Sequence, residues 1–237
     1  MFKPLQGLVL GVLILAASAC KLDVEVAVDA EPNGSGVVNV TATLDQEAAS
    51  RTPNLSSQLR VDDLKTVGWS VVGPTTKGTT TVIQASKKFR NPSEATSLLE
   101  EISGADGPFG DLRLARERKP LWWEWQLEGD LDLKGGIERF GDDDLRTQLE
   151  GTSFGVDPKE VQQAINLKLA VDLPGQVNAK GAEKSDGRMV WTANFDQTQQ
   201  IKATSRVPSI SRPYAIAVAA IAFTAFILLL LRLKKAR

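Results

Sequence analysis

A period-two alternation of apolar and polar residues constrains the fold of this chain more than any other feature. Its clearest instances lie at residues 22–28, 38–44, 121–133, 165–173 and 189–195. A segment of this kind forms a β-strand that is apolar on one face and polar on the other. Strands of a parallel α/β sheet are apolar on both faces, so the pattern favours an antiparallel sheet with one buried face.

Turn signals divide the strands into hairpins. The run Pro32-Asn33-Gly34-Ser35-Gly36 joins the first two strands in a predicted hairpin. A second hairpin is expected from strands at 69–72 and 79–89, joined by the breaker run 73–78.

Three segments carry helix signals and could cover the buried face. They lie at 61–67, at 92–102 with Ser93 as the expected N-cap, and at 158–164. Residues 138–154 are polar and contain glycine, which indicates a long loop or a short helix. We therefore predict an α+β fold in which a curved antiparallel β-sheet is covered on one face by two or three helices.

The N-terminal segment predicts export and lipid attachment. Residues 1–19 combine the basic Lys3 with an apolar stretch and end in small residues, which is typical of a signal peptide. The sequence Ala17-Ser18-Ala19-Cys20 resembles a bacterial lipobox, although Ala17 stands where leucine is usual. We expect Cys20 to carry acyl chains such as palmitate. An ordinary cleavage site beside a chance cysteine, or an uncleaved anchor, is the alternative.

The C-terminal segment predicts a transmembrane helix. Residues 214–231 are uncharged and mostly apolar, and as a helix they span about 27 Å, enough for the hydrocarbon core. The basic tail at 232–237 is then cytoplasmic by the positive-inside rule. These limits leave residues 20–211 as an extracytoplasmic domain and place the protein in the cell membrane.

The formal net charge of −1 conceals an acidic ectodomain. All 29 acidic residues lie between residues 21 and 211, whereas six of the 28 basic residues lie outside this segment. An acidic domain is repelled by anionic headgroups, so we expect attachment through the two anchors rather than through a basic patch. A nucleic-acid partner is not favoured.

The amino-acid composition excludes most kinds of catalytic site. The chain contains no histidine and one cysteine, which excludes a Ser-His-Asp triad, a histidine-ligated metal and an intramolecular disulfide. The acidic run Asp142-Asp143-Asp144 lacks the alternate spacing of an EF-hand loop. We expect a protein that is not an enzyme and that uses no cofactor and no metal.

Several short motifs are similar to the LppM lipoproteins of mycobacteria and their actinobacterial relatives. They are the lipobox followed by the strand Lys21–Val26, Gly68-Trp69, Leu173-Pro174-Gly175-Gln176-Val177, and Val190-Trp191. The resemblance implies a curved antiparallel sheet with helices, of a lipid-binding type, displayed on the cell envelope, and ligands such as phosphatidylinositol mannosides. It brings no catalytic residues, and Cys20 is the one position that it gives a role.

Two functions follow as hypotheses. The first is a binding module that holds an envelope lipid or glycolipid between sheet and helices, with aromatic and aliphatic residues lining the cavity: Trp69, Trp123, Trp125, Leu127, Leu167, Leu169, Val171, Trp191 and Phe195. Periodicity does not distinguish such a lining from packed core. The second is an assembly factor that recruits another membrane protein through Trp122, which lies on the polar face of its strand unless the 138–154 segment covers it.

Overall fold

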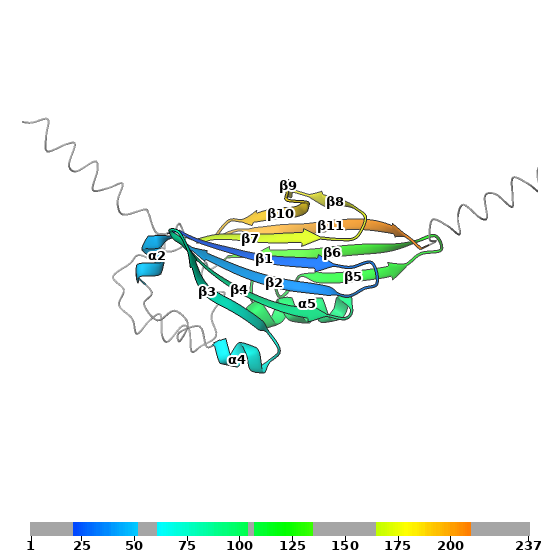
Figure 1. The fold of residues 1–237 in the computed structure, drawn as a ribbon. Coiled ribbons are helices and arrows are strands. Elements are labelled where there is room, and N and C mark those ends of the chain that lie inside the picture. The colour runs from blue at the N-terminus through cyan, green and yellow to red at the C-terminus, as the bar shows by residue number, and fades with distance from the viewer. Residues whose placement is uncertain (1–20, 52–60, 104–106, 135–164, 210–237) are drawn as a thin grey trace, which may run out of the picture.

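The computed structural model describes residues 21–51, 61–103, 107–134 and 165–209. These residues form mostly strands, with three helices among them (Figure 1). In chain order the elements are β1 (Leu22–Ala30), β2 (Gly36–Leu44), α2 (Gln46–Arg51), α4 (Val61–Thr66), β3 (Ser70–Lys77), β4 (Thr80–Phe89), α5 (Pro92–Ser103), β5 (Arg113–Arg118), β6 (Trp122–Asp132), β7 (Ile165–Asp172), β8 (Gln176–Lys180), β9 (Glu183–Ser185), β10 (Arg188–Ala193) and β11 (Thr198–Pro208).

The strands form two sheets. A seven-stranded sheet has the order β3-β4-β2-β1-β7-β10-β9, and a four-stranded sheet has the order β5-β6-β11-β8. The smaller sheet is antiparallel throughout, and its longest pairing joins β6 and β11 from Thr198 opposite Asp132 to Pro208 opposite Trp122. The two sheets lie against each other as an elongated sandwich (Figure 1).

One continuous hydrophobic cluster fills the space between the sheets. The larger sheet contributes residues such as Val28 and Leu169, and the smaller sheet contributes Leu127 and Ile201, all of them fully buried. The 12-residue helix α5 adds Leu99 to the same cluster and contacts β5, β2 and β4. It therefore closes one side of the sandwich, between strands β2 and β4 of the larger sheet and edge strand β5 of the smaller sheet.

The predicted fold differs from the structure in the elements that cover the buried face of the larger sheet. We expected two or three helices over a single sheet, but the four-stranded sheet provides most of the cover. The larger sheet is also mixed rather than antiparallel, because β1 and β7 pair in parallel from Leu22 opposite Ile165 onwards. Alternation reveals that a strand has one buried face, but it does not reveal whether a helix or a second sheet covers that face.

Both predicted hairpins are confirmed, as are helices near 61–67 and 92–102. Strand β3 continues through the predicted breaker run, with a register shift between Val72 and Thr75. The N-cap of α5 is Asn91 rather than Ser93, since the Asn91 side chain accepts a 3.0 Å hydrogen bond from the backbone N–H of Glu94. Pro92 then occupies the first helical position, where its missing N–H costs nothing.

No helix within the described residues is long and apolar enough to cross a membrane. The predicted signal peptide, Cys20, helix 158–164, the acidic run 142–144, the transmembrane segment 214–231 and the tail 232–237 all lie outside the described residues.

The start of β1 and the end of β11 lie at opposite ends of the sandwich (Figure 1). Arg116 of β5 bonds to the carbonyl oxygens of Pro32 and Asn33, which places the β1–β2 turn beside the β5–β6 hairpin. The end of β11 pairs with the start of β6 at this same hairpin. Leu22 is therefore separated from Pro208 by the length of β1, about 30 Å.

Candidate functional site at the β5–β6 hairpin

Most of the predicted lining residues lie in the packed core. Six of them are 0–1% exposed and come from both sheets: Trp125, Leu127, Leu167, Leu169, Val171 and Trp191. A side chain that lines an internal void retains area that a water molecule can touch. These six retain almost none, so the interior that they form is closed in this structure.

Three other predicted residues occupy different surroundings. Trp69 is 5% exposed, and its indole N–H donates a 2.9 Å hydrogen bond to Glu101 of α5. Phe195 is half-buried and packs against the core after β10. Trp123 is half-buried at the start of β6, beyond the closed interior. Two of the nine predicted residues, Phe195 and Trp123, therefore combine an aromatic ring with access from outside, and arginine side chains lie beside the ring of Trp123.

Trp123 belongs to a group of aromatic, aliphatic and cationic side chains that we name the Trp–Arg tip: Arg116, Arg118, Leu121, Trp122, Trp123 and Arg206. The backbone of this tip is fixed by two hydrogen bonds. The N–H of Lys119 donates to the carbonyl of Trp122 at 2.8 Å and closes the β5–β6 hairpin. The N–H of Ser209 donates to the carbonyl of Leu121 at 2.9 Å, which ties the end of β11 to the turn.

Two arginines of β5 lie over the rings that face the sandwich interior. The guanidinium of Arg116 is 3.8 Å from the centre of the Trp123 ring and 5.6 Å from that of Trp125, and Arg118 is 5.6 Å from Trp123. Cations at these distances are attracted by the ring faces. Burial lowers the pKa of Arg116 from its ordinary value, but a guanidinium stays charged at neutral pH.

The opposite face of β6 carries a second aromatic–cation pair. Arg206 of β11 lies 5.4 Å from the centre of the Trp122 ring, and its Nε donates to Glu124 at 3.0 Å. Trp122 and Trp123 point to opposite faces because they are neighbours in one strand. The tip therefore presents an aromatic ring with a cation on each face of the sheet.

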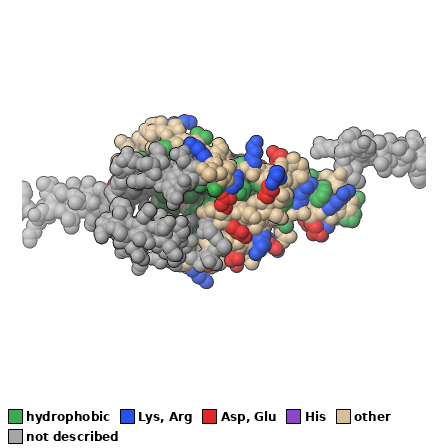
Figure 2. Space-filling view, turned by 90° about the horizontal axis from the view of Figure 1, so that it is seen from below, with side chains coloured by type: hydrophobic (Ala, Val, Ile, Leu, Met, Phe, Trp, Pro, Cys, Tyr) green, Lys and Arg blue, Asp and Glu red, His purple; other side chains and the backbone are tan. Residues whose placement is uncertain are grey.

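The outermost part of the tip is exposed and locally basic. Leu121 is 58% exposed, which is unusual for a large aliphatic side chain next to two tryptophans. Glu117 pairs with Lys119 at 2.7 Å and Glu124 with Arg206, whereas no described carboxylate pairs with Arg118. Figure 2 shows hydrophobic and basic side chains beside one another at the right-hand end of the molecule. This local character differs from the acidic balance of the whole domain.

Three N–H donors at this end are buried and have no acceptor among the described residues: Arg116 Nε, Trp122 Nε1 and Trp125 Nε1. An unsatisfied buried donor costs about 1–3 kcal/mol. All three groups can only donate, so the chemistry that would satisfy them is that of oxygen acceptors such as phosphate, ester or carbonyl groups.

Sequence reasoning identified Trp122 and Trp123 but missed the arginines that accompany them. Strand β5 is short and strongly charged, and β11 has mostly polar residues, so neither has an obvious apolar stripe. The available signal was the Arg-x-Arg spacing of Arg116 and Arg118, which places both side chains on the same face of a strand.

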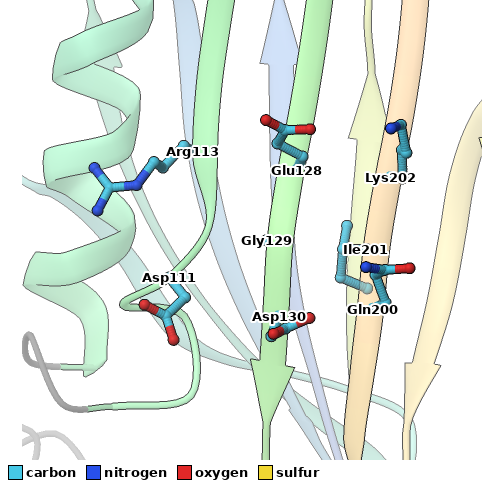
Figure 3. A pocket seen from close by; sticks show the side chains of 8 residues that line it. All are labelled: Asp111, Arg113, Glu128, Gly129, Asp130, Gln200, Ile201 and Lys202. Atoms are coloured by element: carbon cyan, nitrogen blue, oxygen red, sulfur yellow. The ribbon is translucent and has the colours of Figure 1, made fainter.

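A polar pocket of about 330 Å³ lies on the outer face of the smaller sheet (Figure 3). Its lining mixes both charges and comes from β5, β6, β11 and the segment before β5: Asp111, Arg113, Glu128, Gly129, Asp130, Gln200, Ile201 and Lys202. Figure 3 shows Arg113 extending toward the neighbouring helix and away from Glu128. Because the charged groups do not converge on one point, we assign no function to this pocket.

A search of solved structures finds the folded domain of LppM from Mycobacterium tuberculosis, determined by NMR. The two chains are 15% identical, the similarity covers 79% of this chain and 91% of that chain, and the TM-score is 0.45. LppM is the family that the sequence motifs resemble. Neither a scan against protein-family models nor a search of the curated proteins finds a match.

Proposed function

We propose that this chain is a non-catalytic envelope lipoprotein, anchored in the cell membrane, whose extracytoplasmic sandwich binds lipid or glycolipid. The observation that carries the proposal is the Trp–Arg tip. The exposed Leu121 and the half-buried Trp122 and Trp123, beside cations, match the two halves of a lipid, an apolar chain and an acidic headgroup. In this proposal the membrane anchors are an acylated Cys20 and a transmembrane helix at 214–231.

The proposed site is the tip, and the closed interior is the reason for that choice. A lipid chain between the sheets would have to separate residues such as Leu127 and Leu169, which are fully buried. Inserting extra methylene groups into a well-packed core costs about 1–3 kcal/mol even for a single side chain, and a lipid chain inserts many. Binding at the exposed tip avoids this cost because no core residue has to move.

The proposal is tested by measuring the lipid that the full-length protein retains. Wild-type protein is purified from membranes in mild detergent, and retained lipid is identified by native mass spectrometry and lipid extraction. The double substitution Trp122→Ser and Trp123→Ser is expected to reduce retained lipid severalfold. The matched control is Val72→Ser, which removes another exposed apolar side chain, 61% exposed, from edge strand β3.

Retention of equal amounts of lipid by the tip variant and by wild type would remove the tip as the site. Circular dichroism and thermal unfolding of each variant establish that the sandwich is folded before lipid is compared. Should wild type retain no more lipid than an unrelated protein with one membrane helix, lipid binding itself is refuted.

The alternative function is recruitment of another envelope protein through Trp122. It is supported by the place of Trp122 on the polar face of β6, although Arg206 lies over its ring. Trp122→Ser would then abolish pulldown of a membrane protein partner and leave retained lipid unchanged. The opposite result, loss of lipid with no change in bound proteins, supports the lipid-binding proposal.

A further inference from the structure

The Trp–Arg tip carries a tryptophan ring on each face of the hairpin, and this limits what can bind it. Trp122 lies on the outer face of β6, Trp123 faces the interior side, and Leu121 lies at the turn between them. A lipid bilayer surrounds whatever enters it, so it contacts both faces of the hairpin at once. Tryptophan is enriched at the membrane–water interface because its ring is apolar and its N–H is polar.

The place of the tip in the fold brings it close to the proposed membrane helix. Ser209 is hydrogen-bonded to Leu121, and Tyr214 begins the apolar segment 214–231. Five residues of extended chain reach about 17 Å. Given the proposed transmembrane helix, the tip lies within this distance of the start of the hydrocarbon core, and the headgroup layer occupies about 5–8 Å of it. The hairpin can therefore reach the headgroups.

The charge of the tip indicates which lipids it meets. Among the described residues Arg118 has no carboxylate partner, and Arg116 uses its two terminal nitrogens on the carbonyl oxygens of Pro32 and Asn33. A basic residue near an anionic leaflet is attracted to the headgroups.

We infer that the β5–β6 hairpin enters the headgroup region of a bilayer that contains anionic lipid, with Leu121 deepest and Arg118 on the phosphates. This inference rests on the proposed function and specifies its site and its ligand class, a bilayer surface rather than a single extracted lipid. Because the start of β1 lies at the other end of the sandwich, attachment at both ends sets the long axis of the domain along the membrane.

The test measures the depth of the hairpin in a bilayer by electron paramagnetic resonance. The full-length protein carries a nitroxide through Leu121→Cys and, as the matched control, through Val72→Cys. Both are placed in nanodiscs of phosphatidylcholine alone and of phosphatidylcholine with phosphatidylglycerol. Wild-type protein, whose single cysteine is Cys20, shows how much nitroxide attaches at that position in both variants. Collision rates with oxygen, which dissolves in lipid, and with a water-soluble nickel chelate report the immersion of each label.

The inference predicts that the label at position 121 is protected from the nickel chelate and accessible to oxygen, more so with phosphatidylglycerol. The label at position 72 should remain accessible to nickel in both lipids. Equal nickel accessibility at the two positions would overturn the inference. If the same two variants, purified in mild detergent, retain more lipid than the unrelated one-helix protein, only the membrane insertion of the hairpin fails and the proposed function stands. Loss of both refutes the two together.

Discussion

The guanidinium of Arg116 lies 3.8 Å from the centre of the Trp123 ring, and its two terminal nitrogens bond to the carbonyl oxygens of Pro32 and Asn33. One side chain therefore joins the β5–β6 hairpin to the β1–β2 turn of the other sheet. The tip is thus connected to the core of the sandwich, and its aromatic side chains are held in position before any lipid is present.

Arg116→Lys should destabilise the domain by about 1–2 kcal/mol, because an ammonium group cannot stack on the ring and bond two carbonyls at once. Urea unfolding followed by far-ultraviolet circular dichroism measures the change. Arg113→Lys, at an exposed side chain of the same strand, is the control and should change stability by less than about 0.5 kcal/mol. Equal effects at the two positions would show that the Arg116 contacts contribute nothing.

Gly129→Ala should prevent folding or cost more than about 3 kcal/mol. Gly129 has a φ of +145°, and a Cβ there would lie 2.1 Å from the carbonyl oxygen of Asp111. Gly187→Ala is the matched control, since its φ is +86° but no atom lies within 4 Å of the added Cβ. It should cost only the backbone strain, about 1–2 kcal/mol. Thermal unfolding compares them, and similar melting temperatures would contradict the close approach at Gly129.

Asp172→Asn should stabilise the protein at pH 7. Burial first and the nearby Asp29 second raise the pKa of Asp172, while Arg188 opposes them. A raised pKa means that the folded state disfavours the carboxylate, so the ionised group lowers stability once the pH exceeds its folded pKa. The gain from the substitution should therefore shrink as the pH falls toward 3. Melting temperatures between pH 3 and pH 7 test this, and a less stable variant at pH 7 would contradict it.

Leu169→Ala should cost about 2–5 kcal/mol, because Leu169 is fully buried between the sheets and its removal leaves a cavity. Under the proposed function the variant retains as much lipid as wild type, since the tip is unchanged. Native mass spectrometry below the melting temperature measures this. A changed amount of retained lipid would point to the interior as the binding site.

The sequence predicted individual strands better than it predicted their assembly. The alternation from Leu22 and from Ile165 identified two strands correctly, yet their parallel pairing depends on a long connection that has no local signal. The polar strand β11 was not predicted, because Ile201 and Ala203 are its only fully buried apolar residues. Without β11 and β8, the second sheet could not be recognised, and helices were the only cover available.

The candidate site, too, could be predicted only in part from the sequence, because its side-chain contacts depend on how the strands assemble. Periodicity placed Trp123 and Trp125 on one face, but it could not show that Trp125 is closed inside and Trp123 lies at the open end. That difference depends on where the partner strands stop. The stacked arginines come from strands paired with β6 on its two sides, so their contact with the tryptophans exists only in the folded sheet.

Tryptophan fluorescence in brominated lipid tests the central claim, contact between the tip and lipid, most directly. All five tryptophans lie in described strands or beside one, and the segment 214–231 contains none, so the signal comes from the sandwich. Bromine on the lipid chains quenches only nearby indoles. In nanodiscs we predict quenching for wild type and Trp191→Phe, and its loss in the double variant Trp122→Phe and Trp123→Phe. Identical wild-type emission in brominated and ordinary nanodiscs would contradict the account.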